Sequence, residues 1–189
     1  MNNFREEVTN QINNFTRQQA ETFACICIMR VLPFLNPWIN TLHYKMQNET
    51  AANESSSLTY SALQKHLFSI FWSIDVTLAY SDRAYRTSYE CEVAYAARGD
   101  TDIAANAIKN DDRSAAYVAR ATSRAMENTN LYLYGPHGDY ADVAVYACTV
   151  IEKYDQRLIK AFEDIVFKDI NAIKQRNVNK LYEDINVFD

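Results

Sequence analysis

The scarcity of chain-breaking residues limits what this chain can fold into more than any other feature. Only three glycines and three prolines occur in 189 residues, well below ordinary usage. Tight hairpin turns depend on such residues, and the strict alternation of apolar and polar residues that marks a half-buried strand is absent. Because 48% of the residues are hydrophobic and 13% are aromatic, the chain can bury a core. The sequence therefore predicts an all-α fold.

Three stripes of apolar and small residues support this prediction. Their gaps of three and four residues match one face of a helix. Helices commonly pack through such faces, so we interpret the stripes as core, with alanines allowing close helix approach and tyrosines filling the space beside them. The stripes are Tyr85, Tyr89, Val93 and Ala96; Ala115, Val118, Thr122, Ala125 and Thr129; and Tyr140, Ala144, Ala147, Ile151, Tyr154 and Leu158.

Prolines divide the N-terminal half of the chain. One amphipathic segment is expected over residues 3–31, and Pro33 and Pro37 then break or kink its path. Since proline fits the first turn of a helix, a short helix is expected over residues 36–47. A polar loop and then a buried helix over residues 58–80 follow.

Cap and loop signals divide the second half. Gly99-Asp100 is expected to close one helix and cap the next, and Asn110-Asp111-Asp112 is expected to begin another. The sequence GPHGDY at 135–140 is the strongest loop signal. Together these signals predict six to eight helices packed as an antiparallel bundle or array. No linker is long enough to separate a second domain, so residues 1–189 are expected to form a single domain.

Charge and composition disfavour two kinds of partner. The net charge of −5 and the pI of about 5.2 argue against a nucleic-acid ligand and are compatible with a basic protein partner. No apolar leader pattern opens the chain. The longest apolar run, residues 23–35, contains Arg30 and is too short to span a bilayer. The sequence predicts a cytoplasmic protein without a membrane partner.

The reactive residue types form no recognisable catalytic or metal motif. The histidines lack the helical spacing of a metal pair, and Walker, dinucleotide-binding and serine-nucleophile motifs are absent. His137 beside Asp139 could serve as a general base, but an exposed turn explains this pair more simply. We expect no catalytic residue, no metal and no cofactor, and we interpret the cysteines as buried, reduced thiols. They are Cys25, Cys27, Cys91 and Cys148.

Two stretches together resemble a known family. Residues 24–34 read ACICIMRVLPF, a cysteine followed by RVLP and a bulky apolar residue, and residues 85–125 contain the runs AYAARGD, AANA and SAAYVARA. Both stretches are similar to the alanine-rich immunity protein family that accompanies bacterial polymorphic toxins. The resemblance implies that the protein binds a cognate toxin and blocks it without catalysis, and it transfers no catalytic residue to this chain.

We predict a toxin-binding surface on the loops, because loops on a rigid scaffold carry accessible side chains. The expected anchor residues are Tyr132, Tyr134, His137 and Tyr140, and the expected acidic rim is Asp100, Asp102, Asp111 and Asp112. Such a rim suits a basic toxin, and a hetero-inhibitor of this kind is expected to be a monomer or weak dimer. Helix capping is an alternative explanation of the aspartates. A self-associating helical scaffold with a tyrosine-rich interface is the alternative function, and an enzyme with an unrecognised buried site is a third.

Overall fold

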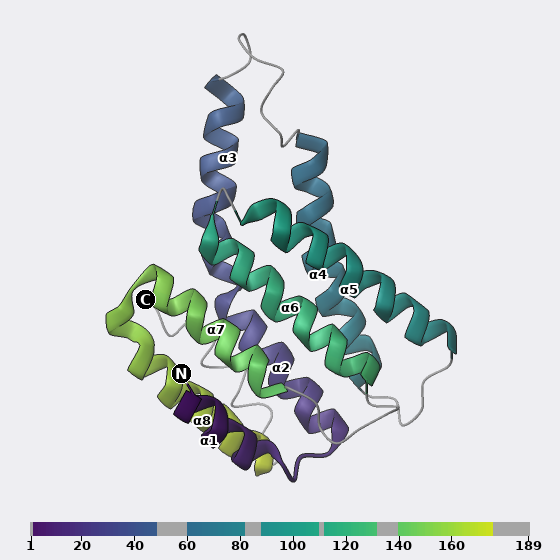
Figure 1. Ribbon diagram of the computed structural model, residues 1–189, viewed down its shortest axis with the longest axis vertical. Helices are drawn as coiled ribbons and strands as arrows, with labels where there is room; N and C mark the ends of the chain where they lie inside the picture. Colours follow the sequence, from purple (N-terminus) through teal and green to yellow (C-terminus); the bar gives the residue numbers. More distant parts are fainter. Residues whose placement is uncertain (1, 49–59, 82–87, 110–111, 132–139, 176–189) are drawn as a thin grey trace.

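The computed structural model confirms the all-α prediction (Figure 1). It describes residues 2–48, 60–81, 88–109, 112–131 and 140–175, which form helices and contain no strand. The helices are α1 (Asn2–Ile12), α2 (Arg17–Val31), η1 (Leu32–Leu35), α3 (Asn36–Asn48), α4 (Tyr60–Ser81), α5 (Ser88–Ile108), α6 (Arg113–Leu131), α7 (Tyr140–Tyr154), η2 (Gln156–Leu158) and α8 (Ile159–Lys174).

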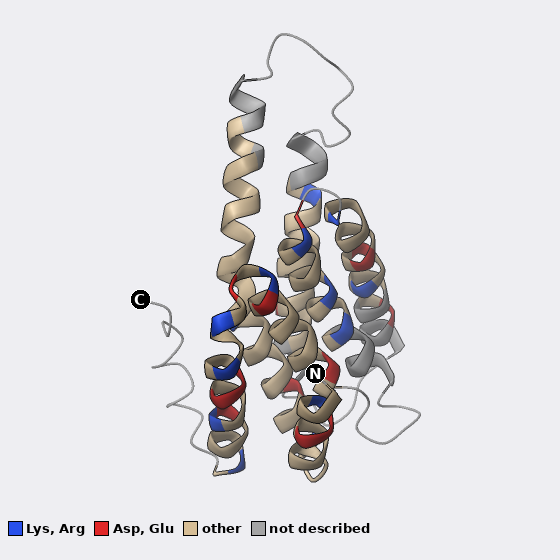
Figure 2. Cartoon of the chain, turned by 60° about the vertical axis from the view of Figure 1, so that its left-hand side comes forward, with Lys and Arg blue, Asp and Glu red and all other residues tan. Residues whose placement is uncertain are grey.

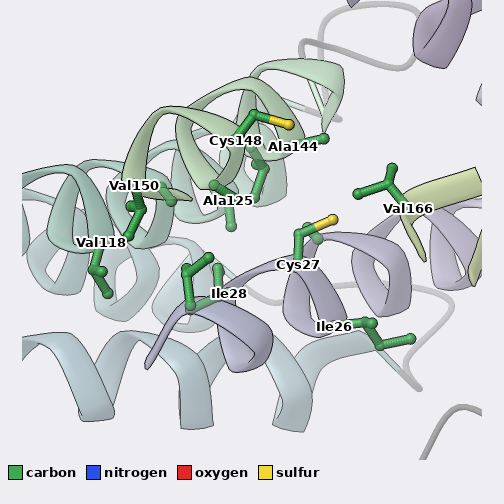
Figure 3. Close-up of a cluster of buried hydrophobic side chains, with 14 of the residues drawn as sticks. Ile26, Cys27, Ile28, Val118, Ala125, Ala144, Cys148, Val150 and Val166 are labelled. Carbon is green, nitrogen blue, oxygen red and sulfur yellow. The ribbon is translucent and has the colours of Figure 1, made fainter. Parts of the chain in front are cut away.

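Helix α2 lies at the centre of the bundle. It contacts α4, α6, α7 and α8, while α4, α5, α6 and α7 each pack against the next helix in the chain (Figure 1). Ten of the fifteen α2 residues are buried, so most of its circumference faces other helices. Figure 3 shows Cys27 of α2 gathered with Ala125 of α6, Cys148 of α7 and Val166 of α8 in one apolar cluster. The cluster forms the core on which the outer helices rest.

The segment expected over residues 3–31 is two helices rather than one. The predicted stripe of Phe4, Val8, Ile12 and Phe15 is buried, but α1 ends at Ile12 and Thr16 begins α2 with a capping box. The Gln19 backbone N–H donates to the Thr16 hydroxyl at 3.3 Å, and the Thr16 N–H donates to Gln19 Oε1 at 2.9 Å. Two orphan donors are satisfied in this way, and the T-x-x-Q pattern was the signal for the break.

The proline predictions hold. Pro33 stands in the 3₁₀ turn η1, which ends α2, and α3 begins at Asn36 and ends at Asn48, one residue beyond the expected end. Trp38 is 2% exposed and fixes the start of α3 in the core. The buried helix expected over residues 58–80 is α4, Tyr60–Ser81.

The prediction that Gly99-Asp100 closes a helix is wrong, because α5 continues through both residues to Ile108. A glycine inside a helix costs only about 0.5–1 kcal/mol, and packing against α4 and α6 outweighs that cost. In the predicted α5 stripe, Ala96 is exposed and Val93 is half-buried against Val76 and Ala97, while the side chains of Tyr85 and Tyr89 lie outside the described part of the chain. The buried face consists of Ala97, Thr101, Ala104, Ala105 and Ile108.

Buried hydroxyl groups join α4 to α5 just beyond Gly99. The Thr101 hydroxyl lies 2.6 Å from the Ser73 hydroxyl, and its oxygen is also 3.1 Å from the Ser69 carbonyl of α4 and 2.8 Å from the Ala97 carbonyl. The Ser73 hydroxyl donates in turn to the Ala97 carbonyl at 3.1 Å. These small side chains let the two helices approach closely while their polar atoms stay satisfied, which explains why the helix persists here.

The other two stripes face the core. Ala115, Val118, Thr122 and Ala125 on α6 are fully buried, as are Tyr140, Ala144, Ala147 and Ile151 on α7. The start of α6 also follows the prediction, since the Ala115 N–H donates to Asp112 Oδ1 at 3.0 Å. The third stripe ends earlier than expected, because Tyr154 is 60% exposed. The Thr129 side chain lies outside the described part of the chain.

A buried ion pair joins α2 to α8. Arg30 donates through Nε to Asp169 Oδ2 and through its terminal nitrogen to Asp169 Oδ1, each at 2.7 Å. The two side chains are 3% and 4% exposed, so the charges depend on one another for solvation. The arginine of the RVLP run is therefore a structural residue that holds the C-terminal helix against the centre.

By length and composition, the stretch Arg17–Thr41 is apolar enough to cross a membrane, with a hydropathy of 1.5 in its most apolar window. Of that window, 61% is buried inside the bundle. A central helix such as α2 acquires the same composition from its place in a protein core.

Candidate binding groove

A groove over α5, α6 and α7 gathers basic side chains on the surface. It consists of two hollows, of about 300 Å³ and about 280 Å³, which share Arg120 as a common wall. Figure 2 shows blue segments following one another along the middle helices, whereas α8, which leads into the C-terminal trace, mixes blue and red. We define the basic groove by Arg98, Lys109, Arg113, Arg120, Arg124 and Lys153 together with Tyr117 and Tyr146.

Within the described part of the chain, four of the six cations form no ion pair. They are Lys109, Arg113, Arg120 and Lys153, which surround the second hollow. Three of them are exposed and Arg120 is half-buried, so an incoming anion can reach all four. Like charges held this close repel one another, and an anionic ligand relieves that repulsion.

The first hollow differs because carboxylates accompany its arginines. Arg98 Nε lies 3.8 Å from Asp102 Oδ2, and Arg124 lies 3.5 Å from Asp142 Oδ2. Asp102 also accepts a 2.6 Å hydrogen bond from the Ser123 hydroxyl, which links α5 to α6 across the hollow. The positive charge of the groove is therefore concentrated at the end formed by Lys109, Arg113 and Lys153.

Two tyrosines supply aromatic surface beside these charges. The rings of Tyr117 and Tyr146 lie 6.3 Å apart with an interplanar angle of 32°, and both residues are half-buried. The Arg120 guanidinium carbon lies 6.0 Å from the Tyr117 ring centroid, a cation–π distance that restrains the arginine. Tyrosine and arginine are the residue types most often found as anchors of protein interfaces.

Three aspartates of the predicted acidic rim belong to the described residues. Asp100 and Asp102 lie in the middle of α5 rather than at a helix start, because the helix does not break at Gly99. Asp112 uses its carboxylate to cap α6, the alternative explanation given above. Asp111 lies outside the described residues. Asp102 lines the first hollow together with Arg98, Arg120 and Arg124, so arginines surround this position of the predicted rim.

The predicted anchor residues have two different outcomes. Tyr132, Tyr134 and His137 lie outside the described residues. Tyr140 is 0% exposed and is one of the largest fully buried side chains. It begins α7 and packs in the core, so its ring is not presented to a partner in this structure.

Sequence reasoning missed the tyrosine and the arginines of α6, although a signal was present. Arg113, Tyr117, Arg120 and Arg124 follow one another at gaps of four, three and four, the spacing of one helix face. They lie on the side opposite the buried stripe that begins at Ala115. The polar stripe was overlooked because its meaning depends on α5 and α7, which add Arg98, Lys153 and Tyr146 from more distant parts of the sequence.

The three described cysteines are buried, free thiols. Burial, followed by the nearby Glu21 charge, raises the pKa of Cys25 to about 12. Burial, followed by Glu163, raises the pKa of Cys148 to about 12, and burial together with Asp169 raises that of Cys27. Such thiols are poor nucleophiles. Among the described residues, no group of three or more His, Cys, Asp or Glu side chains could hold a metal ion.

In comparisons with known proteins, no family model matches this chain, and neither a curated protein nor a solved structure matches it significantly. The resemblance to immunity proteins therefore rests on the two sequence stretches alone and stays a prediction.

Proposed function

We propose that this chain is a non-enzymatic immunity protein that binds a cognate toxin in the bacterial cytosol and blocks it by occlusion. The observation that carries the proposal is the basic groove, in which four cations without an ion-pair partner among the described residues lie beside Tyr117 and Tyr146. The groove is built on three packed helices, so little ordering is needed before a partner binds.

The groove changes the expected character of the partner. A positively charged surface increases the association rate with a negatively charged one and disfavours a basic one. The proposed toxin therefore offers an acidic surface, in place of the basic partner inferred from the aspartates. Inhibition requires no chemistry from this chain, because a bound helical bundle excludes the toxin's substrate from the covered area.

Co-expression tests this proposal. The protein is produced in bacteria together with the product of the open reading frame immediately upstream of its gene. We expect growth to be restored and the two chains to purify as an equimolar complex, with the free protein a monomer or weak dimer by light scattering. Continued growth arrest, with no complex recovered, would contradict the proposed function.

Self-association is the second candidate, and an aromatic patch on α4 favours it. Phe68 is 66% exposed and Phe71 is 48% exposed, and the Phe68 ring stacks on Trp72 with centroids 6.1 Å apart. Sedimentation velocity over a range of concentrations tests this candidate. A stable oligomer that dissociates when Phe68 and Phe71 are changed to serine, but not when the exposed Tyr44 is changed, would support the scaffold function over inhibition.

A further inference from the structure

We propose that the basic groove binds a short acidic segment of a protein, with carboxylates in both hollows and Arg120 between them. This inference rests on the proposed function and names the chemistry of the partner. The groove gathers six cationic side chains, and its two hollows meet at one of them, Arg120. A ligand that uses the whole groove must therefore carry at least two anionic groups.

The size of the hollows suits individual side chains. Each hollow is about 300 Å³ or slightly less, the lower limit for pockets that enclose a small-molecule ligand. An aspartate or glutamate side chain fits each one. Arg120 can donate to a carboxylate on either side, because a guanidinium carries five N–H donors in a fixed plane. Two acidic side chains separated along an extended segment could therefore occupy one hollow each and both accept hydrogen bonds from Arg120.

Asp102 argues for carboxylates over phosphates. This carboxylate stands in the wall of the first hollow, where it is held by Ser123 at 2.6 Å. A phosphate group with nearly two negative charges is repelled by it about twice as strongly as a singly charged carboxylate. A phosphate ligand would therefore be confined to the second hollow, while an acidic peptide can occupy both.

The charge of the whole chain argues for a short segment. The net charge is −5, and the six cations of the groove are included in that value, so the remaining surface is more negative still. A long polyanion such as nucleic acid would extend beyond the groove onto this surface. A segment of a few residues ends within the groove, where Tyr117 and Tyr146 offer apolar contact to its methylene groups.

The test measures binding of a fluorescent ten-residue polyglutamate peptide to the full chain by anisotropy. The groove variant carries Arg113→Gln and Arg120→Gln. The matched control carries Lys65→Gln and Lys168→Gln, which remove the same charge from exposed positions on α4 and α8. We expect the dissociation constant to rise about tenfold in the groove variant and less than about twofold in the control. Added salt should weaken binding to the parent, because it screens exposed charges.

A second variant is designed to bind more tightly, because a misfolded protein would not gain affinity for the peptide. Asp102→Asn removes the repelling charge from the first hollow and keeps an oxygen that can accept from Ser123. We expect this variant to bind polyglutamate about two- to fivefold more tightly than the parent, as the loss of one exposed like-charge contact implies. Unchanged or weaker binding by a folded Asp102→Asn protein would show that the peptide does not occupy the first hollow.

Other outcomes overturn the inference. Equal losses in the groove variant and the control would make the attraction non-specific. Displacement of the peptide by pyrophosphate at lower concentrations than by unlabelled polyglutamate would identify a small phosphate ligand. Tighter binding of a ten-nucleotide single strand would identify a nucleic-acid groove. If the groove variant still protects cells and binds the toxin like the parent, the proposed function stands and this inference fails. If the parent binds polyglutamate but no toxin, the acidic-segment inference stands and the proposed function fails.

Discussion

Removing one partner of the Arg30–Asp169 pair should destabilise the fold strongly. Asp169→Asn keeps the shape of the side chain but leaves the Arg30 charge buried, at 3% exposure, without its carboxylate. Breaking a buried pair in this way costs about 3–5 kcal/mol. Domains of this kind have total stabilities of about 5–15 kcal/mol, so about a fifth or more of the stability is at stake.

Urea denaturation followed by circular dichroism measures this loss. A cost of about 3–5 kcal/mol corresponds to a fall in melting temperature of roughly 6–20 °C for a chain of this length. The double variant Arg30→Met, Asp169→Leu is the informative companion, because it removes both charges and retains apolar contact between α2 and α8. We expect its stability to lie near that of the parent or above it.

A free energy of unfolding of Asp169→Asn within about 1 kcal/mol of the parent value, the usual range for an exposed pair, would contradict a large cost of leaving Arg30 buried without its carboxylate. A double variant as unstable as Asp169→Asn would contradict the same explanation. That result would mean that the hydrogen-bond geometry, each contact at 2.7 Å, holds α8 in place and that the balance of charge does not.

Three further predictions concern single features. Gly99→Ala should stabilise the protein by about 0.5–1 kcal/mol, because Gly99 stands inside α5 and an added Cβ would meet nothing within 4 Å; lower stability in thermal melts would contradict the continuous helix. Thr16→Ala should cost about 0.5–2 kcal/mol through loss of the α2 capping box, and a neutral result in urea titrations would contradict that role. Raised pKa values of about 12 for Cys25 and Cys148 favour the neutral thiols of the folded state, so stability should be complete below pH 9 and fall as the pH rises from about 9 towards 12. In a Cys91→Ser variant, which keeps only the three described cysteines, iodoacetamide labelling at pH 8 should be slow until urea is added, and rapid labelling of the folded variant would contradict thiol burial.

The fold could be predicted because its signals are local. The scarcity of glycine and proline favours helices throughout the chain. Pro33 ends one helix and Asp112 caps the start of another through contacts within a few residues, and the structure confirms both helix boundaries. The helix end predicted at Gly99 was wrong because tertiary contacts decide whether a helix continues through a glycine. The hydroxyl cluster around Thr101 and Ser73 joins helices that the sequence does not show to be adjacent, and it keeps α5 intact.

The candidate site was harder to predict because it is assembled from distant segments. Arg98, Tyr117 and Lys153 come from α5, α6 and α7 and line the groove only when those helices pack together. The overall charge of −5 pointed to a basic partner, since a net charge does not reveal how cations are grouped on a surface. Tyr140 was proposed as an anchor although its stripe also fitted a core position, and its burial follows from the packing of α7.

Amide hydrogen exchange of the free protein and of its complex with the upstream gene product tests the central claim most directly. The groove-lining segment 109–124 is compared with residues 159–174 of α8, none of which lines either hollow. We predict that complex formation slows exchange in residues 109–124 and leaves α8 unchanged. Slowed exchange confined to α8, with residues 109–124 unaffected, would contradict the claim that the basic groove is the binding surface.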